Sequence, residues 1–191
     1  MSIARQFDFI PVEEYLASEL DSPIKHEYLG GAVYAMSGAT NAHNRVATNL
    51  TSALWARLSG PCEAFNSDTK IRIRLPGNTR FYYPDASVVC RSNPPNAAFQ
   101  DAPTVVAEVL SDSTRRLDFG EKKEAYLTIP SLEVYLLVEP ERLKVIAYRR
   151  TEQGFVKEEW EGLAAVLPLP EISVELPLGE IYKNVSITED T

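Results

Sequence analysis

The sequence predicts an α/β domain with a mixed β-sheet, on the basis of three segments. Segment 41–58 repeats apolar residues every four positions, as an amphipathic helix does. Segment 70–75 alternates apolar and basic residues, which is typical of a strand with one buried face. Segment 104–110 is an almost continuous apolar run, as expected for a central strand covered on both faces. With no internal repeat and no linker between them, these segments predict one domain over residues 1–191.

The N-terminal half is expected to contain a short helix, a hairpin and the long helix. The short helix, 11–20, starts at Pro11 and carries acidic residues in its first turn, where they complement the helix dipole. Segment 26–36 is expected to form two short strands joined at Gly30-Gly31. The apolar stripe of the long helix consists of Ala42, Val46, Leu50, Leu54, Trp55 and Leu58.

Most of the remaining chain is expected to form strands. In segment 70–75 the apolar residues face the core, and Lys70, Arg72 and Arg74 face outward. The other expected elements are strands at 81–90, 104–110, 134–138 and 143–149, a helix at 118–128 and extended structure after Leu163.

Length and composition indicate a globular chain that needs neither disulfides nor a structural metal. Of 191 residues, 45% are hydrophobic and 24% charged, and no run approaches the roughly 18–20 apolar residues of a membrane span. Residues 1–11, which include Arg5 and Asp8, do not resemble a signal peptide. Cys62 and Cys90 are isolated, so we expect unpaired core residues of a cytoplasmic protein.

The net charge of −8 does not exclude a nucleic-acid partner, because the charge is unevenly distributed. Residues 31–151 hold 15 basic and 12 acidic side chains, and the acidic excess lies in the flanking segments. Phosphate binding requires a local basic surface rather than a basic total. The distribution therefore permits nucleic acid without arguing for it.

Two acidic residues stand in strands that are otherwise apolar, namely Asp85 and Glu108. A buried carboxylate is costly unless it is paired, hydrogen-bonded or bound to a cation. If the two strands are neighbours, both side chains can converge on one hard cation such as Mg²⁺. The alternative is that Asp85 caps a turn and Glu108 pairs with an arginine; the two interpretations have about equal weight from these residues alone.

A third group follows on the expected helix, where Asp118, Lys122 and Tyr126 are spaced by four and so share one face. A lysine directed at a carboxylate and metal pair would orient a water or stabilise a pentavalent phosphorane. The alternative is a solvated ion pair between Lys122 and Asp118. Lys123 points about 100° away on a helix and ranks lower.

These blocks together resemble the "putative restriction endonuclease" family of the PD-(D/E)XK nuclease superfamily. The resemblance extends over about residues 12–140. The matching blocks are Glu27 with Gly30-Gly31 and Met36, His43, Pro84-Asp85, Glu108-Val109-Leu110-Ser111, the Asp118, Lys122 and Tyr126 spacing, and 133–138.

The resemblance implies a restriction-endonuclease-like core, a mixed β-sheet flanked by helices, that cuts phosphodiesters with Mg²⁺. It implies that Asp85 and Glu108 are metal ligands. The superfamily signature places a lysine two residues after the glutamate, where this chain has Leu110, so Lys122 is the natural substitute. Glu27 is a further acidic candidate, against the alternative of a solvent-facing acid. His43 is a candidate for phosphate contact or proton transfer, against a local hydrogen bond at the helix start.

A basic patch precedes the expected metal strand and consists of Lys70, Arg72, Arg74 and Arg80. Three positive charges on one strand face would suit a phosphate backbone. The alternative is an exposed strand whose charges prevent edge-to-edge pairing.

The sequence therefore predicts an endonuclease that hydrolyses DNA phosphodiester bonds with Mg²⁺, or with Mn²⁺ as a substitute. Cutting both strands of a duplex would favour a homodimer. One alternative is a nuclease fold that binds nucleic acid or a protein partner without cleavage, and another is a hydrolase of small phosphate esters. The position of the Lys122 amine distinguishes the nuclease from the first alternative. An amine that points into solvent, away from the carboxylates, would favour binding without cleavage.

Overall fold

The computed structural model describes residues 9–187. Residues 1–8, with Arg5 and Asp8 of the segment compared with a signal peptide, lie outside the described part. The helices are α1 (Val12–Leu20), α2 (Asn41–Trp55), α3 (Arg115–Phe119), α4 (Glu121–Tyr126), α5 (Leu178–Ile181) and the 3₁₀ turn η1 (Pro170–Ile172). The strands are β1 (His26–Leu29), β2 (Ala32–Ala35), β3 (Glu63–Asn66), β4 (Lys70–Leu75), β5 (Asn78–Tyr82), β6 (Ala86–Val89), β7 (Phe99–Gln100), β8 (Pro103–Val109), β9 (Val134–Val138), β10 (Lys144–Thr151), β11 (Gly154–Glu161), β12 (Val166–Leu169) and β13 (Val174–Pro177).

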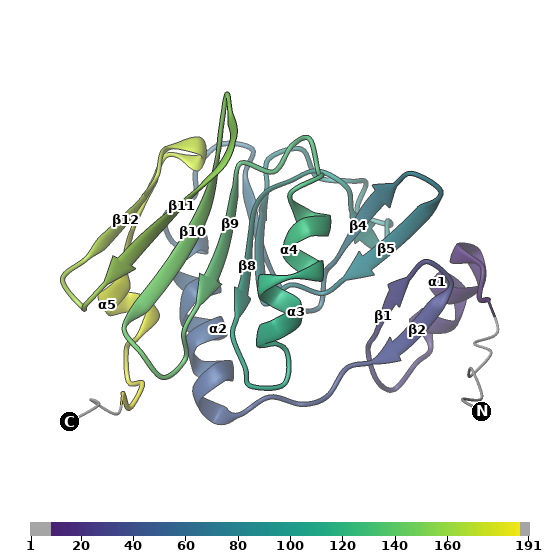
Figure 1. The fold of residues 1–191 in the computed structure, drawn as a ribbon, viewed down its shortest axis with the longest axis horizontal. Helices are drawn as coiled ribbons and strands as arrows, with labels where there is room; N and C mark the ends of the chain where they lie inside the picture. Colours follow the sequence, from purple (N-terminus) through teal and green to yellow (C-terminus); the bar gives the residue numbers. More distant parts are fainter. Residues whose placement is uncertain (1–8, 188–191) are drawn as a thin grey trace, which may run out of the picture.

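A six-stranded mixed sheet, in the order β11-β10-β9-β8-β6-β3, forms the centre of the fold. Strands β8 and β9 are parallel, whereas β6 with β8 and β9 with β10 are antiparallel. Parallel neighbours require a crossover connection, and α3 with α4 supplies it. Figure 1 shows α3 and α4 on the near face of this sheet and α2 on the far face. The predicted α/β class with a mixed sheet is confirmed.

Strand β8 is covered on both faces, as its apolar run predicted. Val105, Ala107 and Val109 belong to the core on the α2 side. Val106 belongs to a second core, which includes Tyr126 of α4. Glu108 follows the alternation of Val106 and therefore points toward α3 and α4.

A second sheet, in the order β2-β1-β5-β4-β7, carries the N-terminal elements. The predicted hairpin is present as β1 and β2, which turn at Gly30 and Gly31, both with positive φ. The predicted N-terminal helix is α1. It packs on this sheet through Tyr15, whose ring lies 5.0 Å from that of Tyr28 and 5.4 Å from that of Phe81.

Two predicted elements are each divided in the structure. The strand expected at 81–90 is β5 and β6, which lie in different sheets, because Pro84 between them cannot donate a ladder hydrogen bond. The helix expected at 118–128 is α3 and α4, which meet at Gly120 with φ −111° and ψ −105°. A Cβ at Gly120 would lie 2.9 Å from the Arg116 carbonyl oxygen, so a side chain there would force a shift.

The C-terminal tail packs more deeply than expected. Beyond the extended strands β12 and β13 it forms α5, and Leu167, Leu176 and Ile181 enter the core beside α2. The charged strand β11 was not predicted. Trp55 was expected on the apolar stripe of α2 but is 65% exposed, because it follows the buried Leu54 and points about 100° away from it.

Cys62 and Cys90 form a disulfide, so the prediction of unpaired cysteines is wrong. The residues are 28 positions apart in sequence. The antiparallel ladder that pairs Glu63 with Val89 brings them opposite each other at the end of β3 and β6. Among residues 9–187, no helix has the length and apolar character needed to cross a membrane.

Candidate active site

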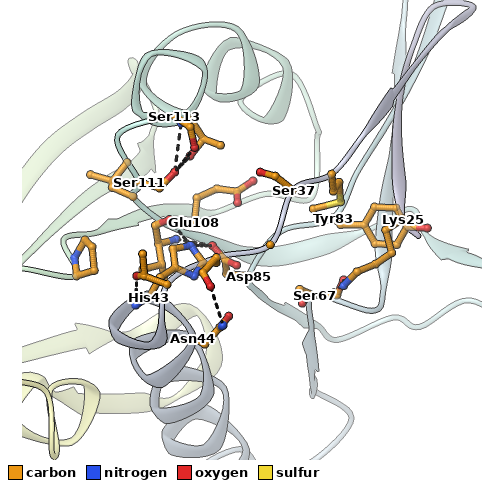
Figure 2. A pocket seen from close by; sticks show the side chains of 18 of the residues that line it. Lys25, Ser37, His43, Asn44, Ser67, Tyr83, Asp85, Glu108, Ser111 and Ser113 are labelled. Atoms are coloured by element: carbon orange, nitrogen blue, oxygen red, sulfur yellow. Dashed lines mark hydrogen bonds and ion pairs between the residues drawn. The ribbon is translucent and has the colours of Figure 1, made fainter. Parts of the chain in front are cut away.

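A cavity of about 730 Å³ opens where the end of β8, the start of β6 and the first turn of α2 meet. Its lining includes His43, Asp85 and Glu108. The amine-bearing residue Lys122 also lines it. In Figure 2, Asp85, Glu108 and His43 lie together in its central part, with Ser111 on one side and Tyr83 on the other.

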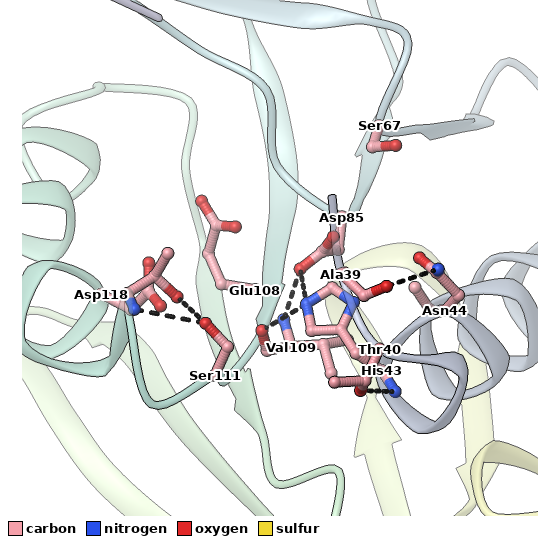
Figure 3. Close-up of polar contacts among 12 residues, drawn as sticks. Ala39, Thr40, His43, Asn44, Ser67, Asp85, Glu108, Val109, Ser111 and Asp118 are labelled. Atoms are coloured by element: carbon pink, nitrogen blue, oxygen red, sulfur yellow. Dashed lines mark hydrogen bonds and ion pairs between the residues drawn. The ribbon is translucent and has the colours of Figure 1, made fainter. Parts of the chain in front are cut away.

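Asp85 is held by the neighbouring strand rather than by a turn. Its Oδ2 accepts a hydrogen bond of 2.7 Å from the Val109 backbone N–H (Figure 3). The β6–β8 register pairs Ala86 with Ala107, so Asp85 and Glu108 follow one step further along the two strands. The two strands are therefore neighbours, as the metal-site interpretation required.

His43 reaches the same strand end from the first turn of α2. The Thr40 side chain caps this helix by accepting from the His43 backbone N–H, which directs the ring toward β8. The ring Nε2 lies 2.8 Å from the Val109 carbonyl oxygen and 3.3 Å from Asp85 Oδ2. Burial opposes the charge on the ring, but the hydrogen bond and charge of Asp85, the Val109 carbonyl and the charge of Asp118 together outweigh it and raise the pKa of His43. The imidazole thus makes long-range contacts rather than a purely local one.

Lys122 lies among three carboxylates. Its Nζ is 2.8 Å from Glu27 Oε1, 3.6 Å from Glu108 Oε1 and 3.8 Å from Asp118 Oδ1, and its side chain is 8% exposed. Burial opposes the charge, yet the carboxylates of Glu108, Glu27 and Asp118 together raise the pKa of Lys122 above its ordinary value. The amine is therefore a fixed positive charge. The expectation of a solvated ion pair does not hold.

Glu108 is almost fully enclosed, at 4% exposure, and among residues 9–187 its carboxylate pairs with Lys122 rather than with an arginine. Its Oε1 accepts a hydrogen bond of 3.3 Å from the Tyr126 hydroxyl. Burial raises the pKa of the Glu108 carboxyl well above its usual range, and the nearby charge of Lys122 counteracts this only in part. Asp118 behaves similarly, because burial raises its pKa as well.

Around the Lys122 amine, carboxylates outnumber positive charges. Glu27, Asp85, Glu108 and Asp118 are four carboxylates, whereas Lys122 is the amine in direct contact with three of them. Asp118 Oδ1 is buried and has no hydrogen-bond partner. A site with this surplus of oxygen acceptors can accommodate a cation.

The structure brings together the five residues predicted for catalysis or metal binding: Glu27, His43, Asp85, Glu108 and Lys122. It adds Asp118, which sequence reasoning treated only as a helical neighbour of Lys122. The signal for Asp118 was its spacing of four from that lysine. Asp118 is only 1% exposed because α3 packs against the sheet, and the spacing of residues in the sequence does not predict this packing.

The predicted basic patch is largely occupied by internal contacts. Lys70 is 5% exposed, so its predicted outward orientation is wrong; the reason is that its strand face lies against α1, with Nζ 5.8 Å from the Tyr15 ring centroid. Arg72 pairs with Asp101 at 2.7 Å, and Arg80 pairs with Glu121 at 2.8 Å.

Arg74 remains exposed, as predicted, at the far end of the same strand face. The four residues therefore do not form one continuous free surface for a phosphate backbone. The charges of Arg72 and Arg80 are compensated by carboxylates of the same chain.

Comparison with known proteins gives the wider context of this site. The chain is 37% identical over 151 residues to an uncharacterized protein of Synechocystis sp., slr1290, across 78% of each chain. It is 30% identical over 154 residues to a second one, sll1609, across 78% of this chain and 86% of that protein. The crystal structure of a "putative nuclease belonging to DUF820" from Anabaena variabilis shares the fold, with a TM-score of 0.69 and 17% identity over 91% of this chain and 97% of that one. The model of the Uma2 family, described as "putative restriction endonuclease", matches residues 12–183, and the chain belongs to this family.

Proposed function

We propose that this protein is a Mg²⁺-dependent endonuclease that hydrolyses DNA phosphodiester bonds, with Mn²⁺ as a substitute cation. The observation that carries the proposal is the surplus of carboxylates around the end of β8, of which Glu108 and Asp118 are buried. Three of them surround one amine, and Asp85 adds a fourth acidic group from the adjacent strand. Such a surplus of negative charge is costly unless the carboxyls take up protons, which the raised pKa values of Glu108 and Asp118 favour, or a cation from outside the chain balances them.

The donor atoms fit Mg²⁺ better than a softer metal. Asp85 and Glu108 would hold the ion. The Val109 carbonyl oxygen is a further oxygen near Asp85, because both lie within 3.3 Å of the same atom, His43 Nε2. Among residues 9–187 no three His, Cys, Asp or Glu side chains form a ready-made cluster. Mg²⁺ commonly binds through one or two carboxylates and retains several waters, which matches this donor set.

The residues of the chain have distinct roles in this proposal. When bound, Mg²⁺ supplies Lewis-acid polarisation of a phosphoryl oxygen and lowers the pKa of a coordinated water. Lys122 holds a permanent positive charge beside the carboxylates and stabilises the negative charge that develops on the phosphorane. Glu27 and Asp118 hold the Lys122 amine in place, at 2.8 and 3.8 Å.

His43 is the proton-transfer group of the proposal. Its Nδ1 is buried without a hydrogen-bond partner, while Nε2 is anchored to β8. Val109 and Asp85 orient the ring before substrate binds, and in this proposal the imidazole exchanges a proton with a substrate oxygen.

The proposal is tested by calorimetric titration with Mg²⁺ and Mn²⁺, in parallel with plasmid cleavage. Wild type is compared with Asp85→Ala and Glu108→Ala. Glu175→Ala, which removes an exposed acid on β13, is the matched control. We expect both site variants to lose cation binding and cleavage and the control to retain both. If the wild type binds neither cation and cleaves nothing, the acids are structural and the non-cleaving module takes the place of this proposal.

A further inference from the structure

A second polar network lies beside the acidic cluster of the candidate active site and reaches the same cavity through Tyr83. Its centre is Glu19 of α1, whose side chain is 4% exposed. Glu19 Oε1 accepts from the His26 backbone N–H at 2.7 Å and from the Tyr83 hydroxyl at 2.9 Å. Its Oε2 lies 3.0 Å from His26 Nδ1. One carboxylate is thus fully engaged by two segments that are distant in sequence.

The network continues through Tyr83 to Lys70. The Tyr83 hydroxyl accepts a hydrogen bond of 2.9 Å from Lys70 Nζ and donates to Glu19, so both of its hydrogen-bonding functions are used. The Tyr83 ring also lies near two amines, with Lys70 Nζ 5.1 Å and Lys25 Nζ 5.7 Å from its centroid. The Tyr83 side chain is therefore held in position by hydrogen bonds at its hydroxyl and by amines near its ring.

The two ends of the network lead directly into the active site. His26 immediately precedes Glu27, the residue that contacts the Lys122 amine. Tyr83 is two residues before Asp85, and Pro84 between them restricts the backbone. Figure 2 shows Tyr83 and Lys25 together on one side of Asp85, with His43 on the other.

Fold stability alone does not account for a buried ionic network at this position. Tyr15, Tyr28 and Phe81 already form an apolar cluster that joins α1, β1 and β5. Buried ionic groups can often be replaced by apolar residues of similar volume without loss of stability, so their benefit is positional more than energetic. The hydrogen bonds of Glu19 and Lys70 favour one arrangement of these segments, because an alternative packing would leave a buried charged group without its hydrogen-bond partner.

We propose that Glu19 and Tyr83 are positioning residues that fix the separation of Glu27 and Asp85 across the site. The inference rests on the proposed nuclease function, since it explains how the cation ligand Asp85 and the lysine partner Glu27 are held in register. Neither Glu19 nor Tyr83 touches the reacting atoms in this account. Their effect passes through His26 on one side and Pro84 on the other.

The test is the concentration of Mg²⁺ that gives half-maximal plasmid cleavage by the full chain. Tyr83→Phe and Glu19→Ala are expected to raise this concentration about tenfold, while cleavage at saturating Mg²⁺ falls by less. Glu19→Gln keeps a carbonyl oxygen for the His26 N–H and the Tyr83 hydroxyl, and it is expected to restore most of the loss.

The matched control is Tyr182→Phe, which removes a buried hydroxyl that donates to the Lys144 carbonyl oxygen at 2.7 Å in a different part of the core. Thermal unfolding of every variant separates a loss of positioning from a loss of fold. An unchanged Mg²⁺ requirement in Tyr83→Phe, with an active wild type, overturns the inference and leaves the nuclease proposal standing. An equal rise in Tyr182→Phe overturns it too. A wild type that cleaves nothing overturns the nuclease proposal itself.

Discussion

Lys122 and Lys70 are buried to nearly the same degree, at 6% and 5% exposure, but they have opposite environments. Lys122 has three carboxylates within 3.8 Å of its amine, and they raise its pKa above the ordinary value. Lys70 donates to the neutral Tyr83 hydroxyl, and burial lowers its pKa although Glu19 counteracts this.

The comparison shows that burial alone does not identify a reactive lysine. A single buried amine needs about one carboxylate to balance it, and Lys122 has more than that. The surplus indicates a region built to receive additional positive charge. Lys70 lies in a region without such a surplus, where its role is to complete a hydrogen-bond chain.

The largest expected effect is on cleavage. Replacing Lys122 by Met removes the charge beside the developing phosphorane and is expected to lower kcat by about 10²–10³-fold, in the range measured for single electrostatic stabilisers. Lys70→Met is expected to lower it only several-fold, through a weaker hold on Tyr83. Single-turnover cleavage of a plasmid at saturating Mg²⁺ measures both. Similar losses in the two variants would remove the functional distinction between the lysines.

The next effect is on stability. Lys122→Met leaves the buried carboxylates of Glu108 and Asp118, and the half-buried one of Glu27, without their counter-ion and is expected to cost about 3–5 kcal/mol in the free energy of unfolding. Lys70→Met removes one hydrogen bond to a neutral hydroxyl and is expected to cost about 1–2 kcal/mol. Guanidinium unfolding without divalent cation gives both values. A larger loss in the Lys70 variant would contradict the charge assignment.

A smaller effect is expected in the pH dependence of stability. Because the pKa of Lys70 is lowered in the folded protein, the unfolded chain binds more protons between that value and about 10.4. The free energy of unfolding of the wild type should therefore rise with pH in this window relative to Lys70→Met, by at most about 1.4 kcal/mol per pH unit. Urea unfolding of both proteins from pH 8 to 10.5 gives the difference; a falling difference would contradict the prediction.

The smallest effect is expected at the neighbouring lysine of α4. Lys123 Nζ lies 4.8 Å from the Tyr148 ring centroid and points away from the carboxylates, as its helical position predicted. Lys123→Ala should cost about 0.5–1 kcal/mol of stability and leave the cleavage rate unchanged. A drop in cleavage comparable with that of Lys122→Met would mean that the two amines exchange roles.

The sequence predicted which residues gather at the candidate site better than it predicted the contacts around them. Glu108 in an apolar run and Asp85 after a proline were informative because a lone acid in a buried strand requires a partner. The inward orientation of Lys70 could not be predicted in the same way. The strand alternation correctly placed Lys70 opposite Ile71 and Ile73, but it does not reveal that α1 covers that face.

The other differences also arise from tertiary packing. The Cys62–Cys90 disulfide depends on the register of β3 and β6, which sequence spacing does not give. The division of segment 81–90 between two sheets depends on where the chain leaves β5, and Pro84 was the local signal for it. The burial of Asp118 depends on how α3 lies against β9, where the Tyr135 hydroxyl donates to the Asp118 carbonyl oxygen at 3.0 Å.

The break at Gly120 has a consequence for how this site can be retuned. A lysine on the same strand as its glutamate would be locked to that strand by the pleat. Here the Lys122 amine belongs to the six-residue helix α4, which is joined to α3 at Gly120. The position of the amine relative to the carboxylates therefore depends on how α4 packs on the sheet. Apolar substitutions in the core beneath α4, such as at Ala125 or Ile129, would move the amine without altering any charged group. If the site cleaves as proposed, packing beneath α4 would give a graded control over its rate without any change in its charged groups.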